Sequence, residues 1–221
     1  MEGSGGPRAV LWDMDGTLVD SAAYHLRAWR ETLAGLGLAV THERFMQTFG
    51  RRNDAVIRDL VDPAADAASI ARIAGEKEER YRTFVREGGL VPLPGVLPWL
   101  ERLRAADWKH AVASSAPHAN IETILEVAGL FGLFDAVAGD EDVTVGKPDP
   151  QVFLVAAAKI GAMPVRCVVV EDAPAGVEGG RRAGMRTIGV GTEHGELEAD
   201  IAVASLAELP DDAFARLLDG R

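Results

Sequence analysis

Residues 9–21 read A-V-L-W-D-M-D-G-T-L-V-D-S. The short apolar run Ala9–Trp12 is halted by acidic residues and glycine, which predicts a buried strand. Asp13 and Asp15 follow at once, so we expect them at the carboxyl end of that strand. Such a pair can hold a divalent cation through a side chain and a backbone carbonyl, while one carboxylate stays free to attack an electrophile. Gly16 permits a sharp turn; the structural alternative is an acidic turn whose aspartates are solvated.

Composition indicates an ordinary globular protein. The chain has 221 residues, of which 48% are hydrophobic and 26% charged, so one domain, or a domain with an insertion, can bury a sizeable core. The one cysteine, Cys167, cannot form an internal disulfide, which suits a reducing compartment. No apolar run approaches the ~20 residues of a membrane span, and the start of the chain lacks the apolar core of a signal peptide. We therefore expect a cytoplasmic protein without a membrane partner.

Charge is unevenly distributed along the chain. The formal net charge of −11 argues against non-specific nucleic-acid binding. Residues 20–92 hold 11 Lys+Arg and 11 Asp+Glu, so the rest of the chain carries the whole negative excess. An anionic substrate that approaches this acidic part needs a metal ion and locally placed cations. The segment 20–92 can supply some of those cations.

Residues 20–92 show only helical periodicity. From Ala22 to Leu36, apolar residues recur every three or four positions, as in an amphipathic helix. Glycines and prolines cluster at 88–95 and suit a hinge or linker. The sequence therefore predicts a helical insertion over 20–92 between core segments 1–19 and 93–221. Its further predicted helices are Thr41–Thr48, Asp54–Leu60 and Ala65–Arg86.

After Gly95, strand patterns alternate with helical patterns, which predicts a parallel sheet with helices on its faces. The fold class is therefore α/β, with a Rossmann-like parallel-sheet core and an inserted all-helical cap domain. The predicted strands are His110–Ala113, Ala136–Ala138, Cys167–Val170, Thr187–Val190 and Ile201–Ala204. The predicted helices are Val96–Ala106, Pro117–Ala128, Pro150–Ile160, Pro174–Ala183 and Leu206–Leu218.

Polar residues gather where the predicted strands end, which is where parallel sheets bind ligands. Ser114 and Ser115 can form a phosphate cradle at the start of the next helix, in whose first turn Pro117 would lie, although a helix N-cap is an equally common role. Lys147 lies in the stiff loop G-K-P-D-P and either neutralises a phosphoryl oxygen or is an exposed lysine. The adjacent acids Glu171 and Asp172 need a cation such as Mg²⁺, unless Asp172 caps the next helix.

Four strings, in order, resemble the motifs of the haloacid dehalogenase superfamily, which consists mostly of magnesium-dependent phosphotransferases. They are D-M-D-G-T-L-V-D-S from Asp13, V-A-S-S, G-K-P-D-P and V-V-V-E-D-A-P-A-G. The resemblance implies that Asp13 attacks phosphorus to form an aspartyl-phosphate. It implies that Asp15 protonates the leaving oxygen and activates the next acceptor. It also implies phosphate binding by Ser114, with Ser115 beside it, and Lys147, and magnesium held by Asp13, Asp15, Glu171 and Asp172.

The helical insertion resembles the small cap of the β-phosphoglucomutase-like subfamily, whose closure excludes water and reads the substrate. The string S-A-A-Y-H-L-R-A-W is similar to the first cap helix of the mutases. This match implies substrate-side roles for His25 and Trp29, whereas a lone polar surface histidine is the alternative. Lys77 matches a cap lysine that reaches the substrate, with a solvated ion pair as the alternative.

The substrate loop of the cap matches the mutases only in part. They place an arginine three residues after the loop glycine, where it grips the distal phosphate of the substrate. Here Gly50 is followed by Arg51, Arg52 and, in the arginine's place, Asn53. Either arginine can substitute for the missing one or be a solvated surface charge. Two more substrate contacts of the mutases are altered, at Ala116 and His118.

We therefore expect a monomeric, Mg²⁺-dependent phosphatase whose substrate is a small phosphorylated metabolite, foremost a sugar phosphate. The nearest alternative is a β-phosphoglucomutase that interconverts β-glucose 1-phosphate and glucose 6-phosphate, which the Tyr24–His25 region supports and Asn53 weakens. A binding protein without turnover is disfavoured because no catalytic position is replaced. A phosphonatase would use a cap lysine for a Schiff base. Dehalogenases of this superfamily lack the second aspartate, which is present here as Asp15.

Overall fold

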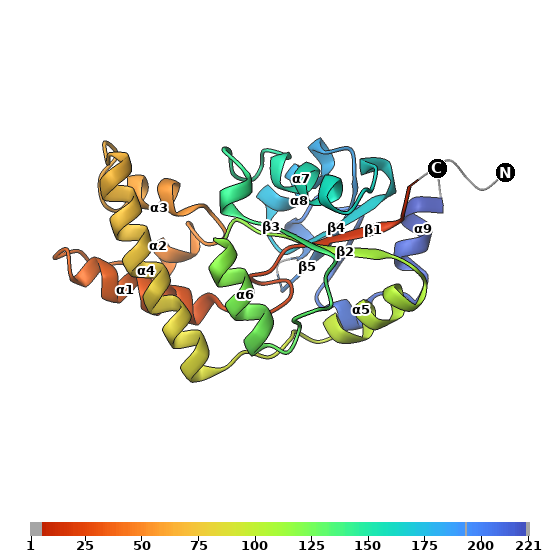
Figure 1. The fold of residues 1–221 in the computed structure, drawn as a ribbon, viewed down its shortest axis with the longest axis horizontal. Coiled ribbons are helices and arrows are strands. Elements are labelled where there is room, and N and C mark those ends of the chain that lie inside the picture. The colour runs from red at the N-terminus through yellow and green to blue at the C-terminus, as the bar shows by residue number, and fades with distance from the viewer. Residues whose placement is uncertain (1–5, 193, 220–221) are drawn as a thin grey trace.

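Six strands pair in parallel to form one sheet, in the order β3-β2-β1-β4-β5-β6 (Figure 1). The computed structural model of the protein describes residues 6–192 and 194–219. The strands are β1 (Ala9–Trp12), β2 (Lys109–Ala113), β3 (Ala136–Ala138), β4 (Cys167–Glu171), β5 (Arg186–Val190) and β6 (Ile201–Val203). Their short, mostly apolar sequences suit a sheet covered on both faces. The predicted α/β fold is confirmed.

One set of helices covers both faces of this sheet, and a second set forms a separate group at one end of it (Figure 1). That group holds α1 (Ala22–Ala34), α2 (His42–Met46), α3 (Asn53–Leu60) and α4 (Ala67–Gly88). The helices around the sheet are α5 (Val96–Ala105), α6 (His118–Val127), α7 (Gln151–Lys159), α8 (Pro174–Arg182) and α9 (Ala213–Asp219). Short 3-10 turns lie at Asp140–Asp142, Pro164–Arg166, His194–Glu196 and Leu206–Glu208. Within the described residues, no helix combines the length and apolarity needed to cross a bilayer.

Two prolines mark where the sequence-based helix limits are wrong. The sequence predicts one helix over Leu206–Leu218, but α9 begins only at Ala213, after a separate 3-10 turn. Pro210 lies between them, and a proline inside a helix removes a backbone donor and clashes with the preceding turn. Pro117 likewise lies just before α6 rather than in its first turn. The other helix ends agree with expectation or differ from it by one or two residues.

Alternation along β1 creates two apolar cores, one on each face of the sheet. Val10 and Trp12 join the cluster that includes residues of α5, α6 and α9, whereas Ala9 and Leu11 face α7. In register, Trp12 lies between Val112 of β2 and Val170 of β4. The residues that follow these three strands therefore emerge together at one edge of the sheet.

The cap helices α1–α4 surround an apolar cluster of their own. Its buried members are Trp29, Leu33, Val40, Phe45, Val56, Ile57 and Ile73. The second half of α4 differs, because Tyr81, Phe84 and Val85 belong to the core cluster beside the sheet. The two chain segments that connect cap and core lie side by side, since Leu93 N–H donates to Leu18 O at 2.9 Å. The boundaries of the cap at residues 20 and 92 stay a prediction.

A buried hydrogen bond joins β1 to β2 inside the core. Trp12 Nε1 donates to His110 Nδ1 at 3.0 Å, and both side chains are almost completely buried. Burial lowers the pKa of His110 to about 4, against the opposing effect of Asp135. Protonation of Nδ1 would set a second N–H donor against the indole N–H. The folded protein therefore requires a neutral imidazole here.

We predict that this histidine destabilises the protein in acid. Between the unfolded-state pKa of about 6.5 and the folded value of about 4, the unfolded chain binds the proton more readily, so stability falls as pH falls. His110 should account for about 2 kcal/mol of lost unfolding free energy between pH 7 and pH 5. In His110→Asn, the side-chain oxygen can still accept from Trp12 but does not titrate. Urea unfolding at both pH values should show the smaller loss for the variant; equal losses would contradict the prediction.

Candidate active site

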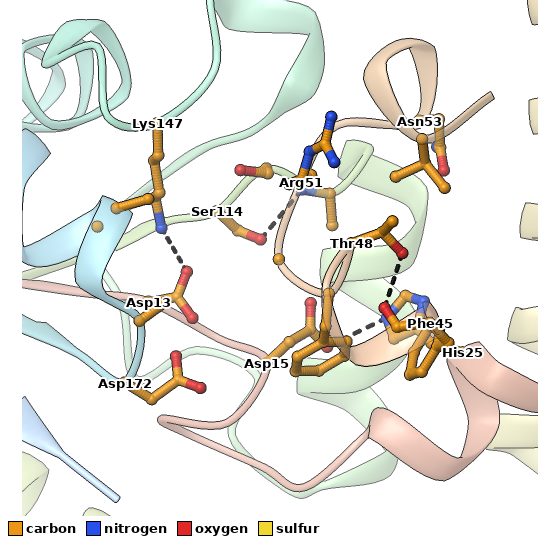
Figure 2. A pocket seen from close by; sticks show the side chains of 18 of the residues that line it. Asp13, Asp15, His25, Phe45, Thr48, Arg51, Asn53, Ser114, Lys147 and Asp172 are labelled. Carbon is orange, nitrogen blue, oxygen red and sulfur yellow. Dashed lines mark hydrogen bonds and ion pairs between the residues drawn. The ribbon is translucent and has the colours of Figure 1, made fainter. Parts of the chain in front are cut away.

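The carboxyl edge of the sheet brings acidic side chains together. Asp13 directly follows β1, and its backbone N–H donates to Val170 O at 3.0 Å, so the sheet itself fixes its position. Glu171 ends the neighbouring strand β4, and Asp172 comes next. Single carboxylate oxygens of Asp13, Glu171 and Asp172 all lie within 4.8 Å of one another. Figure 2 shows Asp13 and Asp172 directed into the same space.

Lys147 reaches into this acidic group from the loop before α7. Its Nζ lies 2.5 Å from Asp13 Oδ1 and 2.5 Å from Glu171 Oε1, and it donates to Ala113 O at 3.1 Å. The side chain is only 7% exposed, so Lys147 is not a surface lysine. Asp149 Oδ1 accepts the N–H of Gln151 at 3.0 Å, which holds the loop at the start of α7. The loop thus presents one cation to the site.

Two glycines make room for the acids. A Cβ at Gly176 would lie 1.9 Å from the Glu171 carboxylate, and a Cβ at Gly16, where φ is +95°, would lie 2.1 Å from Asp172 Oδ2. Glu171 Oε2 accepts the N–H groups of Asp172 and Ala173, both at 3.1 Å. Glu171 rather than Asp172 therefore satisfies the backbone at the start of α8. The alternative of Asp172 as a helix cap is wrong.

Close packing of these acids in a buried place perturbs their protonation. Burial and the charge of Glu171 raise the pKa of Asp13 well above its ordinary value, despite the opposing charge of Lys147. Burial and Glu171 raise the pKa of Asp172 to about 8. A hard cation that takes oxygen ligands relieves such repulsion, so this donor set fits Mg²⁺. The place of Asp15 among the magnesium ligands stays a prediction.

Asp15 lies in the same pocket but has different neighbours. Ser21 Oγ donates to Asp15 Oδ1, and His25 Nε2 lies 3.4 Å from the same oxygen. Burial raises the pKa of the Asp15 carboxyl, but His25 and the hydrogen bond from Ser21 outweigh burial, so the pKa lies below its ordinary value. The two aspartates of the first motif are therefore in contrasting environments.

His25 is held from the cap side by Lys77. Lys77 Nζ lies 2.8 Å from His25 Nδ1 and donates to Glu78 Oε1 at 2.9 Å. The ring of Tyr81 stacks on His25 at a centroid distance of 3.9 Å. Lys77 forms an ion pair with Glu78, but its side chain is only 2% exposed. The alternative of a solvated ion pair is therefore wrong. A chain of contacts thus runs from α4 through His25 to Asp15.

One pocket collects most of the residues singled out from the sequence. Arg51 lines it while its guanidinium pairs with Asp59 at 2.9 Å. Arg52 is not brought to the pocket, because its NH1 donates to Val143 O at 2.8 Å and its Nε pairs with Asp140 at 3.1 Å. Arg52 therefore joins the cap to the core loop after β3. The other expected residues that line the pocket are Asp13, Asp15, His25, Trp29, Gly50, Asn53, Lys77, Ser114, Ser115, Lys147, Glu171 and Asp172.

The loop after β2 supplies the hydroxyl groups. Ser114 is 2% exposed, and its Oγ accepts the N–H of Ala116 at 3.1 Å. Ser115 lines the pocket next to it. Because α6 begins only at His118, the two serines belong to a turn ahead of the helix rather than to its N-terminus. Their roles in phosphate binding stay a prediction.

Sequence reasoning alone does not single out Ser21, Glu78 or Asn120, which all take part in the hydrogen bonds around the pocket. A weak signal exists for the first two. Ser21 directly precedes the cap, and Glu78 follows Lys77, which lies on the same helical stripe as the apolar residues Ile73 and Tyr81. A stripe of this kind marks the buried face of a helix.

Comparison with known proteins places this site in a family. Residues 7–184 match the model of the haloacid dehalogenase-like hydrolases. The chain belongs to that family. The four motifs are therefore those of the family, and the chain is an enzyme of the haloacid dehalogenase-like type.

Its relatives in the haloacid dehalogenase-like family include a mutase and phosphatases. β-Phosphoglucomutase of Bacillus subtilis is 30% identical over 210 residues, 91% of each chain. Fructose-1-phosphate phosphatase YqaB of Escherichia coli is 32% identical over 184 residues, 82% of this chain and 95% of its own. A crystal structure of mutant CbbY from Rhodobacter sphaeroides in complex with xylulose-(1,5)bisphosphate has a TM-score of 0.82 at 27% identity, and the match covers 92% of this chain and 96% of that one.

We predict that Gly176→Ala weakens magnesium binding at least tenfold, because the added methyl group would displace the Glu171 carboxylate. Isothermal titration calorimetry with MgCl₂ measures the change. Gly75→Ala is the matched control, since a Cβ there meets nothing within 4 Å. That control should bind Mg²⁺ as the parent does and be slightly more stable. Unchanged Mg²⁺ affinity in Gly176→Ala would count against the assignment of Glu171.

Proposed function

We propose that the protein is a Mg²⁺-dependent phosphatase that removes phosphate from a small metabolite, a sugar phosphate, through an aspartyl-phosphate intermediate. The observation that carries the proposal is the contrast between the two aspartates of the first motif. Asp13 faces Lys147 at 2.5 Å within the acidic group, whereas Asp15 is bonded to Ser21 and faces His25. This contrast supports attack on phosphorus by Asp13 and proton transfer by Asp15.

In the first step, a carboxylate oxygen of Asp13 attacks phosphorus while the bond to the leaving oxygen breaks. For this step Asp15 must carry a proton, which it delivers to that leaving oxygen, so that it is ionised at the start of the second step. Lys147 Nζ and the Ser114 hydroxyl hold the equatorial phosphoryl oxygens, where negative charge accumulates. Magnesium, when bound by Asp13, Glu171 and Asp172, supplies positive charge that offsets the repulsion between carboxylate and phosphate.

In the second step, Asp15 accepts a proton from a water molecule that attacks the phosphorus of the aspartyl-phosphate. The bond from phosphorus to Asp13 breaks, and inorganic phosphate is released. The lowered pKa of Asp15 suits this role, because the carboxylate must be ionised to accept the proton. His25 positions Asp15 for both transfers, through the 3.4 Å contact and its link to Lys77.

The cap side of the pocket supports a small substrate. Trp29, Phe45 and Phe49 line it from the cap, and Phe45 lies across from the acidic group in Figure 2. Such an apolar wall excludes bulk water and strengthens the electrostatic interactions inside. The phosphatase and mutase relatives act on sugar phosphates by name, which supports a substrate of that class.

A β-phosphoglucomutase remains the second candidate, favoured by the 30% identity to the Bacillus subtilis enzyme. A mutase must bind a bisphosphate in two orientations and therefore needs a firm second phosphate site. Asn53 occupies the place of the mutases' arginine, and its amide donates to Glu78 at 2.7 Å. Phosphonatase chemistry is disfavoured, because Lys77 Nζ is held between His25 and Glu78 and is not free to form a Schiff base.

We predict that Asp13→Asn abolishes phosphate release from sugar phosphates, because the amide is not a competent nucleophile. Asp15→Asn and Asp15→Ala should retain phosphoryl transfer at a rate lower by about 10²–10⁴-fold, the usual range for loss of a general acid–base. Release of inorganic phosphate in the presence of Mg²⁺ measures both. Asp211→Asn, on the surface, is the control and should match the parent enzyme. Normal turnover by Asp13→Asn would contradict the proposed mechanism.

A second experiment separates phosphatase from mutase. Phosphorus NMR would follow the protein with Mg²⁺ and β-glucose 1-phosphate, with and without a catalytic amount of β-glucose 1,6-bisphosphate. We expect inorganic phosphate to accumulate with little glucose 6-phosphate, because Asn53 cannot replace an arginine at a second phosphate. Conversion to glucose 6-phosphate that depends on the bisphosphate would make the enzyme a mutase instead.

We propose a cytoplasmic monomer that binds neither nucleic acid nor membranes. Its uneven acidic charge and its single cysteine, Cys167, which is buried in β4, support this proposal. Light scattering and cell fractionation would test it.

A further inference from the structure

The pocket has a second polar group on the side away from Lys147, which we call the distal cluster: Asn53, Lys77, Glu78 and Asn120. Figure 2 shows Asn53 on the opposite side of the pocket from Lys147. The first three residues line the pocket, and Asn120 lies behind them on core helix α6. None of these residues has a part in the proposed phosphoryl transfer itself, apart from the contact of Lys77 with His25. Phosphoryl transfer therefore does not explain why these polar residues lie in the pocket.

Glu78 is the centre of the distal cluster. Its Oε1 accepts from Asn53 Nδ2 at 2.7 Å and from Lys77 Nζ at 2.9 Å, and its Oε2 accepts from Asn120 Nδ2 at 2.5 Å. Burial raises the pKa of Glu78, but Lys77, His25 and the hydrogen bond from Asn120 together outweigh burial and bring the pKa below its ordinary value. A carboxylate has about four acceptor positions, of which three are filled here. One acceptor position remains for a hydrogen-bond donor of the substrate.

The lysine and arginine side chains that line the pocket are already paired, among the residues that the structure describes. Lys147 pairs with Asp13, Lys77 with Glu78, and Arg51 with Asp59. Arg51 is also 42% exposed at the rim, where solvent screens its charge. A second phosphate at the distal end would therefore face a buried carboxylate without a free cation to receive it.

We propose that the distal cluster selects monophosphates that carry a hydroxyl group at the end remote from the phosphate, and that Glu78 rejects bisphosphates. A hydroxyl group can donate to the open acceptor position of Glu78, whereas a phosphate has only acceptors and like charge to offer. Specificity of this kind rests on a repulsive element as well as an attractive one. The proposal deepens the proposed function and rests on it.

The Glu78 side chain is fixed in place, which should make the preference for monophosphates over bisphosphates large. Asn120 binds the carboxylate from the core, and Arg82 NH1 in turn donates to Asn120 Oδ1 at 2.9 Å. The Glu78 side chain is only 7% exposed, so it cannot turn out into solvent when a phosphate approaches. A fixed carboxylate of this kind cannot relieve the repulsion by moving, which is why we expect a large preference.

The test compares pairs of ligands that differ only in a distal hydroxyl or phosphate. They are fructose 1-phosphate with fructose 1,6-bisphosphate, β-glucose 1-phosphate with its 1,6-bisphosphate, and xylulose 5-phosphate with xylulose 1,5-bisphosphate. Binding to full-length Asp13→Asn protein with Mg²⁺, measured by calorimetry, avoids turnover. We expect at least one monophosphate to bind, and its bisphosphate partner to bind about tenfold more weakly or worse.

Two further variants in the Asp13→Asn background assign the effect. Glu78→Gln removes the charge at nearly constant shape and should reduce the preference to about threefold or less. Glu79→Gln makes the same change at an exposed neighbour on α4 and should leave the preference unaltered. Circular dichroism would confirm folding of both. If Glu78→Gln does not fold, the comparison of monophosphates with bisphosphates in the Asp13→Asn protein still decides the selectivity.

The outcomes separate this inference from the proposed function. Equal or tighter binding of the bisphosphates, no binding of any monophosphate, or an unchanged preference in folded Glu78→Gln would each overturn the inference. Phosphate release by the parent enzyme is measured apart from binding. A monophosphate preference without any phosphate release would leave the distal cluster as inferred and overturn the phosphatase proposal.

Discussion

Repulsion among three carboxylates at the edge of the sheet, two of them buried and one half-buried, is the constraint on which the site depends. Asp13, Glu171 and Asp172 approach one another because β1 and β4 are paired in register and both end there. Lys147 and two backbone N–H groups offset part of the repulsion, and two glycines leave the space. The apolar cores on both faces of the sheet hold the acids in place. The result is a compact acidic group with one lysine, held in a fixed arrangement by the sheet.

The same pocket shows how one type of side chain serves three purposes. Asp13 is set beside Lys147, Asp15 beside Ser21 and His25, and Glu78 between Lys77 and Asn120. Each acid has distinct partners: burial and Glu171 raise the pKa of Asp13, whereas neighbouring groups lower the pKa values of Asp15 and Glu78. In the proposed function, these differences rather than the acids themselves separate attack, proton transfer and recognition of the substrate.

The sheet, its strand ends and the family are predictable from the sequence because they depend on local patterns. Short apolar runs followed by charged residues mark β1 and β4, and chain order then brings Asp13 and Glu171 to one edge. The distal cluster is not predictable in this way. Glu78 and Asn120 are 42 positions apart, and only the packing of α4 on α6 brings them together. Arg52 is a similar case, since its partner after β3 lies outside any local pattern.

Helix α4 connects the cap with the core. Its 22 residues make a rod of about 33 Å, with one half in the apolar cluster of the cap and the other half in that of the core. Lys77 and Glu78 lie near its middle, where Glu78 contacts Asn120 of the core helix α6 and Lys77 contacts His25 of the cap helix α1. Because α1 packs on α4 and carries His25, the two helices together set how His25 meets Asp15 in the core. One helix thus serves both groups to which the proposals give a role, because it carries the residue that would recognise the substrate and contacts the histidine beside Asp15.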